Sequence, residues 1–374
     1  MITQREYKKS GIFLPLMGFG MMRLPLTSQN PADIDEAKAL AMIDRAYQAG
    51  IRYFDTAVPY HGGKSEEFVG RALAKYPRDS FVLADKLPLW SLSSLDEAKE
   101  IFNSQLKKCR VEYFDHYLLH SLQTAFWSKA EKLGLYDFLA DMKAAGKIKR
   151  LGFSFHDTPE VLRTIADAHP WDFAQIQLNF FDWEHYRSRE QYEVLTERGI
   201  PVVIMEPLRG GALGALSPAA TAVFKKYNPD VTAASWSFRF AASLPNVITV
   251  LSGMTYMEHL EDNIGTMTDF KPLTDEERGV IDEALMAYYN SCSVPCTSCR
   301  YCSVCPQGID MPNIFYLYNQ LQMTGDKARY TRKMGEMPES VRPDRCLSCG
   351  KCMKYCPQHI DIPAALRKTI AALG

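Results

Sequence analysis

The fold is indicated first by the stretch Tyr53-Phe54-Asp55-Thr56-Ala57-Val58-Pro59-Tyr60, a short apolar run that ends in polar residues. Patterns with helical spacing stand on either side of it. One covers Ile34–Ala49 and ends at Gly50, and the other covers Ser65–Tyr76 and stops before Pro77. Glycine just past the last periodic residue commonly ends a helix, and proline cannot continue one. The stretch is therefore predicted to be a buried strand between two helices.

The same alternation of strand and helix repeats as far as residue 252. The eight candidate strands are Leu16–Met21, Tyr53–Ala57, Phe81–Lys86, Phe114–His120, Ile148–Ser154, Phe173–Leu178, Val202–Glu206 and Val247–Ser252. No GxGxxG motif follows the first strand, so the pattern favours a closed (β/α)8 TIM barrel over a doubly wound sheet. We expect this α/β barrel to span residues 1–290 and a small, mostly α-helical domain to span 291–374.

The composition is that of a soluble globular protein. Of 374 residues, 47% are hydrophobic and 23% are charged, and the formal net charge is −1. This balance predicts neither a nucleic-acid nor a membrane partner. The apolar run at 12–22 is interrupted by Pro15, so a buried entry strand is preferred over a signal peptide. Nine of the ten cysteines lie between Cys292 and Cys356, which is typical of metal sites in a reducing cytoplasm.

The second group of cysteines has a strongly diagnostic spacing. It reads Cys346-Leu-Ser-Cys349-Gly-Lys-Cys352-Met-Lys-Tyr-Cys356-Pro357, which is C-x2-C-x2-C-x3-C-P. In this motif three thiolates hold one [4Fe–4S] cluster, and the fourth ligates a neighbouring cluster. Zinc usually pairs two C-x2-C units and does not need a third. The run therefore predicts iron–sulfur chemistry.

The first group reads Cys296-Thr-Ser-Cys299-Arg-Tyr-Cys302-Ser-Val-Cys305-Pro306, and its last gap has two residues instead of three. Together the groups supply eight ligands for two [4Fe–4S] clusters. We expect a crossed assignment. Cys296, Cys299 and Cys302 would join Cys356, and Cys346, Cys349 and Cys352 would join Cys305. Because of the short gap and the spare Cys292, assembly of one cluster alone stays an alternative. The helical spacer between the groups resembles the α-helical two-cluster ferredoxins.

Ionisable residues follow three consecutive strands. Asp55 stands near the end of the second strand and Tyr60 just after it, Lys86 ends the third strand and His120 ends the fourth. In a (β/α)8 barrel the carboxyl ends of the strands meet at the catalytic face. In type, order and strand position these four residues resemble the catalytic tetrad of the aldo-keto reductases, and the resemblance covers about residues 10–290. His116 is interpreted as structural or as a surface residue.

The resemblance implies a carbonyl reductase or alcohol dehydrogenase that uses NADPH or NADH. Tyr60 would exchange a proton with the substrate oxygen. Lys86 would depress the pKa of Tyr60 from its ordinary value near 10, Asp55 would hold Lys86, and His120 would orient the substrate. The residues implied in cofactor binding are Ser154, Gln177, Met205, Leu208, Gly210, Ser252, Gly253 and Asn263. Basic residues for a 2′-phosphate are missing near Gly253, and only Arg209 or His259 could replace them.

Two functions stay open. The first is an oxidoreductase whose clusters relay electrons, with ferredoxin or another electron carrier as partner, in a monomer or homo-oligomer. A hydride carries two electrons and a cluster one, so a flavin is not excluded as the group that splits the pair. The second is an NAD(P)H-binding redox sensor or regulator in which the iron–sulfur clusters are structural.

Overall fold

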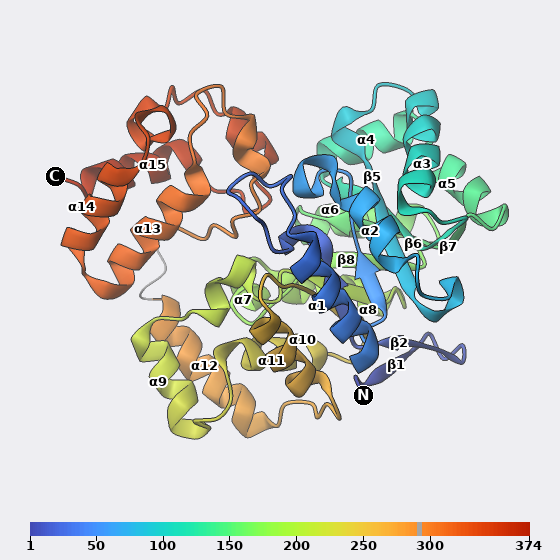
Figure 1. The fold of residues 1–374 in the computed structure, drawn as a ribbon, viewed down its shortest axis with the longest axis horizontal. Helices are drawn as coiled ribbons and strands as arrows, with labels where there is room; N and C mark the ends of the chain where they lie inside the picture. The colour runs from blue at the N-terminus through green and yellow to red at the C-terminus, as the bar shows by residue number, and fades with distance from the viewer. Residues whose placement is uncertain (290–293) are drawn as a thin grey trace. The chain divides into compact units, whose positions relative to one another are not determined.

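The computed structural model describes residues 1–289 and 294–374 (Figure 1). By its internal contacts the chain divides into two compact units. The barrel unit comprises Met1–Pro207 and Phe238–Leu273, and the cluster unit comprises Leu208–Ser237 and Thr274–Gly374. The predicted boundary at residue 290 and the spare Cys292 lie outside the described residues. The two units are interleaved along the sequence, because the segment that follows Pro207 packs with the C-terminal part of the chain.

The barrel unit contains a closed barrel of eight parallel strands, which confirms the predicted fold. Around the barrel the order is β10-β3-β4-β5-β6-β7-β8-β9. The strands are β3 (Met17–Gly20), β4 (Tyr53–Asp55), β5 (Val82–Pro88), β6 (Phe114–Leu122), β7 (Ile148–Phe155), β8 (Phe173–Gln177), β9 (Val202–Met205) and β10 (Val247–Gly253). Nearly every residue of these strands is buried, as expected for strands that are covered by helices on the outside and by side chains within.

Helices surround this barrel, and Figure 1 shows them around the strands that it labels. They are α1 (Glu36–Ala49), α2 (Ser65–Leu73), α3 (Leu95–Cys109), α4 (Thr124–Lys132), α5 (Leu135–Ala144), α6 (Pro159–Ala168), α7 (Asp182–His185), α8 (Ser188–Glu197) and α11 (Met257–Met267). Helix α10 (Ala233–Ala242) runs from the cluster unit into the barrel unit. Periodicity predicts one helix over 129–145, but Gly134 adopts φ +64° and the chain forms two, since this conformation ends a right-handed helix.

A short hairpin precedes the barrel. It consists of β1 (Gln4–Tyr7) and β2 (Ile12–Pro15), so the single buried strand expected over 12–22 is wrong. The Tyr7 hydroxyl donates to the Asp172 carbonyl at 2.8 Å, and the Arg5 guanidinium donates to the Leu244 carbonyl at 2.9 Å. Both carbonyls belong to loops that enter barrel strands. The hairpin therefore seals the amino-terminal end of the barrel and leaves the carboxyl ends of the strands for chemistry.

The cluster unit is mostly helical. Helix α9 (Pro218–Tyr227) packs against α12 (Asp275–Tyr289). The remaining helices are α13 (Met311–Thr324), α14 (Lys327–Glu336) and α15 (Ile362–Ala371). The two cysteine groups contain the 3-10 turns η6 (Tyr301–Val304) and η9 (Lys351–Tyr355), which pack against each other. Among the described residues, none of the helices combines the length and apolarity that crossing a bilayer requires.

Candidate functional site

A buried ion pair lies at the carboxyl ends of β4 and β5. The Lys86 Nζ donates to Asp55 Oδ1 at 2.6 Å and to the Thr56 carbonyl at 2.7 Å. The Lys86 and Asp55 side chains are 1% and 4% exposed. Removing a charge from water is costly unless it is paired and hydrogen-bonded, and here both conditions are met. The pair therefore holds the ammonium group at a defined point of the barrel mouth.

Tyr60 and His120 complete the set of four residues predicted from the strand ends. The Lys86 Nζ lies 5.1 Å from the centroid of the Tyr60 ring. The rings of Tyr60 and His120 lie edge to face, with centroids 6.5 Å apart and planes at 88°. All four residues are at least nine-tenths buried. The structure thus brings the tetrad together at one end of the barrel.

The expected effect of Lys86 on Tyr60 is contradicted. The pKa of Tyr60 is raised well above its ordinary value, chiefly by burial and further by the charges of Asp55, Glu206 and Asp85. Lys86 is paired with Asp55, so its positive charge is partly offset at the phenol and does not overcome the effect of burial. The cation that opposes the rise is Arg23, which was not predicted from the sequence. Tyr60 is therefore a protonated phenol at neutral pH.

His120 is a neutral imidazole in this site. Burial lowers its pKa well below the ordinary value, and the charges of Lys86 and His156 lower it further. The Trp90 ring lies 4.9 Å from the His120 ring, between centroids. A neutral imidazole can offer one donor and one acceptor to a ligand. His116 lies four residues before His120 on β6. It is fully buried, and its ring stacks on the Tyr53 ring with the centroids 5.1 Å apart. The interpretation of His116 as a structural residue therefore stands, and its interpretation as a surface residue is wrong.

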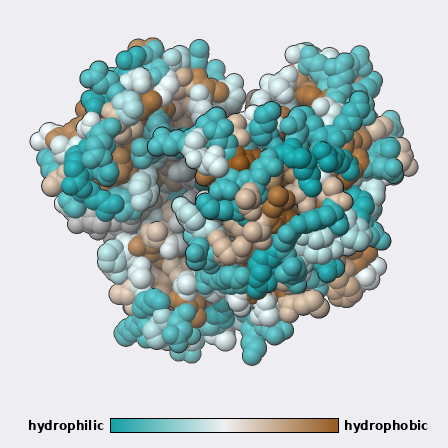
Figure 2. Space-filling view, viewed as in Figure 1, coloured by the Kyte–Doolittle hydropathy of each residue, from teal (hydrophilic) through white to brown (hydrophobic). Residues whose placement is uncertain are grey.

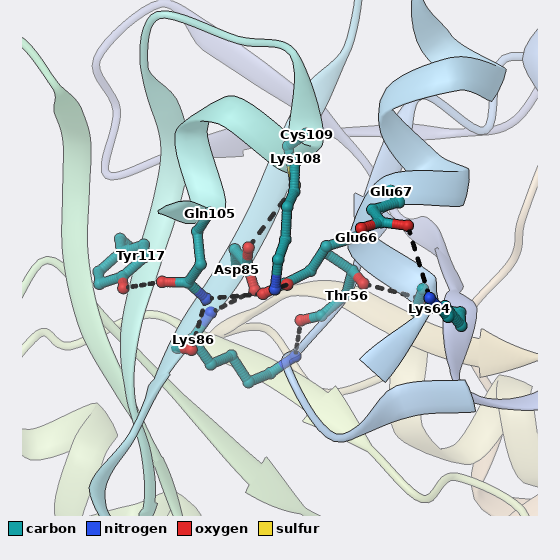
Figure 3. Close-up of polar contacts among 11 residues, drawn as sticks. Thr56, Lys64, Glu66, Glu67, Asp85, Lys86, Gln105, Lys108, Cys109 and Tyr117 are labelled. Atoms are coloured by element: carbon teal, nitrogen blue, oxygen red, sulfur yellow. Dashed lines mark hydrogen bonds and ion pairs between the residues drawn. The ribbon is translucent and has the colours of Figure 1, made fainter. Parts of the chain in front are cut away.

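The backbone of Lys86 is itself held by buried polar groups behind the barrel wall (Figure 3). The Asp85 carboxylate accepts from the Lys86 N–H at 2.8 Å, and the Gln105 amide donates to the Lys86 carbonyl at 2.9 Å. Gln105 also donates to Glu66, which Lys108 pairs at 2.8 Å. Helices α2 and α3 thus fix the root of the Lys86 side chain, a contribution that strand-end reasoning missed.

The predicted nicotinamide site lies on β7, β8 and β9. The Ser154 Oγ accepts from the Ser121 N–H at 2.7 Å, and Gln177 donates to Asp182 at 2.7 Å. Gln175 pairs in register with Ser154, and its amide nitrogen lies 3.6 Å from the Met205 sulfur. Its amide oxygen is buried and has no partner within the described part of the chain. The sequence predicted Gln177 instead of Gln175 because the two glutamines of Gln-Ile-Gln are two residues apart, and such residues point to the same face of a strand.

The predicted adenine end lies on β10 and α11. Asn263 donates to the Ser252 hydroxyl at 3.1 Å, and both residues are buried. A Cβ at Gly253 would lie 3.1 Å from the Cγ of Arg23, so the arginine side chain lies against this glycine. Arg23 also pairs with Glu206 at 3.7 Å. The segment that lacks basic residues in sequence therefore has one beside it in space.

The loop at 208–211 belongs to the cluster unit. Gly210 has φ +67°, and a Cβ there would lie 1.8 Å from the Thr297 carbonyl oxygen, so only glycine fits. The Arg209 side chain is buried and donates to the Pro295 carbonyl at 3.2 Å, with Gln358 Oε1 at 3.5 Å. Arg209, considered for a 2′-phosphate, is thus engaged by the segments that flank Cys296 and Cys356.

The cysteines surround two separate cavities in the cluster unit. Cys296, Cys299, Cys302 and Cys356 line one with about 320 Å³ of empty space, and Cys305, Cys346, Cys349 and Cys352 line the other with about 340 Å³. These are the sets of the crossed assignment. In the described residues, no three metal-binding side chains converge closely enough for a single ion. Sulfurs placed around a cavity fit a cubane, whereas one zinc ion would draw four to about 2.3 Å.

Electrostatics agree with this grouping. Burial raises the pKa of Cys302, and the neighbouring Cys299, Cys296 and Cys356 raise it further. Burial also raises the pKa of Cys352 to about 11, with contributions from Cys305, Cys346 and Cys349. The thiolates of each set repel one another, and bound iron would relieve that repulsion because metal coordination deprotonates thiols.

The shorter gap before Cys305 is accommodated by a shorter 3-10 turn. Turn η6 covers Tyr301–Val304, and turn η9, which is one residue longer, covers Lys351–Tyr355. Cys305 follows η6 and lines the cavity of the second group, and Cys356 follows η9 and lines the cavity of the first. The serines at 298 and 348 both have positive φ and donate their N–H groups to Cys296 and Cys346 at 3.4 Å. The two loops are therefore conformational copies.

The comparisons with known proteins agree with this geometry. The model of the Aldo/keto reductase family matches residues 16–286. The chain belongs to the aldo/keto reductase family. A second model, the 4Fe-4S dicluster domain, matches residues 295–360, so this aldo/keto reductase carries an iron–sulfur domain.

Relatives support the family assignment at modest identity. "Probable aldo-keto reductase 1" of Glycine max is 29% identical over 212 residues, which are 54% of this chain and 59% of that protein. "Uncharacterized oxidoreductase YqkF" of Bacillus subtilis is 27% identical over 74% of this chain and 94% of its own length. The holo form of an aldo-keto reductase from Bacillus halodurans matches the fold with a TM-score of 0.64, 24% identity, and coverage of 76% and 96% of the two chains. This aldo/keto reductase is an oxidoreductase of the NAD(P)H-dependent class.

Proposed function

We propose that this aldo/keto reductase interconverts a carbonyl compound and its alcohol, with proton exchange at Tyr60. The observation that carries the proposal is the buried Lys86–Asp55 pair beside Tyr60, with the edge of His120 facing the same ring. A bound nicotinamide would supply or accept the hydride. The four side chains would then position the substrate oxygen and handle its proton.

The protonation states favour reduction. With its pKa raised, Tyr60 keeps its proton at neutral pH and can donate it to an oxygen that gains negative charge. Neutral His120 can donate a second hydrogen bond to that oxygen, while the fixed Lys86 charge stabilises it. Burial strengthens these interactions because little water competes with them. Oxidation of an alcohol would require Tyr60 to lose its proton, which burial opposes.

The nicotinamide amide would be held by Ser154 together with Gln175, which we add to the predicted Gln177. The unpaired buried amide oxygen of Gln175 and its nitrogen beside Met205 support this addition. Met205 would pack on the ring through its sulfur. The adenine end of the cofactor would lie along Ser252, Gly253 and Asn263, whereas Leu208 and Gly210 belong to the cluster unit and their role in cofactor binding stays a prediction. Arg209 is engaged by Pro295 and Gln358, and Arg23, which lies beside Gly253, pairs with Glu206. Since both arginines are occupied, we propose NADH in preference to NADPH.

The eight cysteines would hold two [4Fe–4S] clusters that relay electrons. Met311 and Ile362 line both cavities, so their side chains lie between the two cysteine sets. N–H donors at the serines 298 and 348 would tune the reduction potentials of the two sites. Since a hydride carries two electrons and a cluster accepts one, a flavin or a partner would split the pair.

Anaerobic purification with iron and sulfide analysis tests the cluster count. Adding NADH and NADPH separately, while carbonyl turnover and the cluster EPR signal are followed, tests the rest. We expect turnover that Tyr60→Phe removes and that Tyr113→Phe, a tyrosine outside the tetrad, leaves unchanged. Turnover that survives Tyr60→Phe would contradict the proposed chemistry. Turnover without any change in the EPR signal would contradict the relay and leave the clusters structural.

A further inference from the structure

We propose that an exposed face of the cluster unit docks a small acidic protein that carries one electron at a time. This docking face consists of Val304, Leu347, Lys351, Met353, Lys354 and Tyr355. The proposal rests on the proposed role of the clusters as an electron relay, and it names the place and the kind of partner that the relay would use.

The docking face covers the more exposed of the two cysteine sets. Cys349 is exposed, and it lines the cavity shared with Cys305, Cys346 and Cys352. In the other set, Cys302 and Cys356 are buried. Because an electron must reach a partner through the shortest available protein layer, the set that contains Cys349 is the natural exit. The residues of the docking face lie between and beside its ligands in the sequence.

Large apolar side chains are exposed on this face. Leu347 is 65% exposed, Val304 is 46% exposed, and Met353 and Tyr355 are each 39% exposed. Turn η6, which ends at Val304, packs against turn η9, which contains Met353 and Tyr355, so these three residues lie on adjoining segments. Leu347 lines the same cavity as Cys349. Clustered exposed apolar residues with a polar rim mark protein contacts, and aromatic residues and methionine are enriched in them. On the face that Figure 2 shows, apolar side chains lie scattered among hydrophilic ones.

The charge around these apolar residues is positive. Residues 294–374 contain 11 Lys and Arg against 6 Asp and Glu, a net charge of +5, although the whole chain has −1. Lys351 and Lys354 flank Cys352 in the sequence, and both are exposed. Neither forms an ion pair with any other residue that the structure describes. Two unpaired ammonium groups beside apolar side chains complement an acidic protein surface.

This combination favours a redox protein over other polyanions. A nucleic-acid-binding surface would be broadly basic and would not need exposed leucine or methionine, because phosphate contacts dominate its binding. Electron-transfer encounters instead use small interfaces, and charge mainly accelerates their formation. In the step itself, one electron leaves the reduced cluster unit and enters the oxidised carrier. No bond is made or broken, and no other reactant is needed.

Binding of an oxidised acidic plant-type ferredoxin to the full holoprotein tests the proposal. The dissociation constant is measured by calorimetry at about 0.05 and 0.5 M salt, between which the Debye length shrinks severalfold. The test variant is Lys351→Glu/Lys354→Glu, and the control is Lys327→Glu/Arg329→Glu, which makes the same charge change at exposed positions of α14. Leu347→Ser probes the apolar part. Iron content and visible absorption verify that each variant keeps its clusters.

We expect the test variant to bind at least about tenfold more weakly than the control, and the wild type to weaken at high salt, as charge-steered complexes do. Leu347→Ser should weaken binding at both salt concentrations. If the test variant loses iron, Lys351→Gln/Lys354→Gln replaces it. Equal affinity of test and control variants would overturn the proposal, as would tighter binding of the basic carrier cytochrome c. Because the assay uses no nicotinamide, failure of carbonyl reduction would leave its result unaffected.

Discussion

Replacing Lys86 with methionine separates the energetic role of the buried ion pair from its chemical role. The change keeps most of the apolar part of the side chain and removes the terminal ammonium group that faces Asp55 at 2.6 Å. Both side chains are less than 5% exposed, so the carboxylate would be left buried without its counter-ion. Breaking such a pair costs about 3–5 kcal/mol of unfolding free energy.

The same substitution at an exposed pair is the matched control. Lys99 pairs with Asp96 at 3.0 Å, and the two side chains are 47% and 86% exposed. Solvent screens this pair, so Lys99→Met should cost less than about 1 kcal/mol. Four of the five tryptophans lie in the barrel unit, so their fluorescence in urea mainly follows the unfolding of the barrel: Trp90, Trp127, Trp171 and Trp183.

The penalty should depend on pH in a definite direction. Burial raises the pKa of Asp55 above its ordinary value, and Lys86 is what opposes the rise. In Lys86→Met the folded protein therefore takes up a proton more readily than the unfolded chain. The stability lost at neutral pH should return as the pH falls through the folded pKa of Asp55, which is the opposite of ordinary acid destabilisation.

In these variants the change in activity should not parallel the change in stability. Lys86→Met should lower kcat for carbonyl reduction by at least about 10²-fold, the lower range for loss of acid–base assistance. In Asp55→Asn/Lys86→Met the orphan charge is gone, so stability should largely recover while kcat stays low. The reasoning would be refuted if Lys86→Met and Lys99→Met unfolded at the same urea concentration, or if Lys86→Met kept wild-type kcat.

Three further outcomes are expected. Gly210→Ala forces a Cβ into the Thr297 carbonyl at φ +67°, so the thermal midpoint should fall, whereas Gly214→Ala, which meets nothing within 4 Å, should leave it unchanged; equal effects would contradict the close contact. Cys349→Ser should remove about half of the iron, and retention of the full content would contradict the eight-ligand assignment. Because the pKa of His120 is lowered and that of Tyr60 is raised, kcat/KM for reduction should stay flat between pH 6.5 and 10.0, and an inflection near 6.5 would show that His120 titrates normally.

Much of the architecture could be predicted from local sequence. Apolar runs that alternate with helical patterns located all eight barrel strands, since burial on both faces of a strand leaves a continuous apolar signature. The hairpin before the barrel was missed because its first apolar residues, Ile12 and Phe13, are exposed and look like a buried strand only in sequence. The break at Gly134 was missed because the apolar period runs through it.

The sequence by itself located the residues that we propose carry the chemistry: the tetrad through strand-end position, and the expected iron–sulfur ligands through cysteine spacing. Only the tertiary structure decided how those residues behave. The pKa of Tyr60 rises instead of falling because burial and the Asp55 charge outweigh a lysine that is already paired. Gln175 was separable from Gln177 only by its contact with Met205 on the next strand. Burial and contacts between distant segments depend on the whole fold, so no local sequence pattern predicts them.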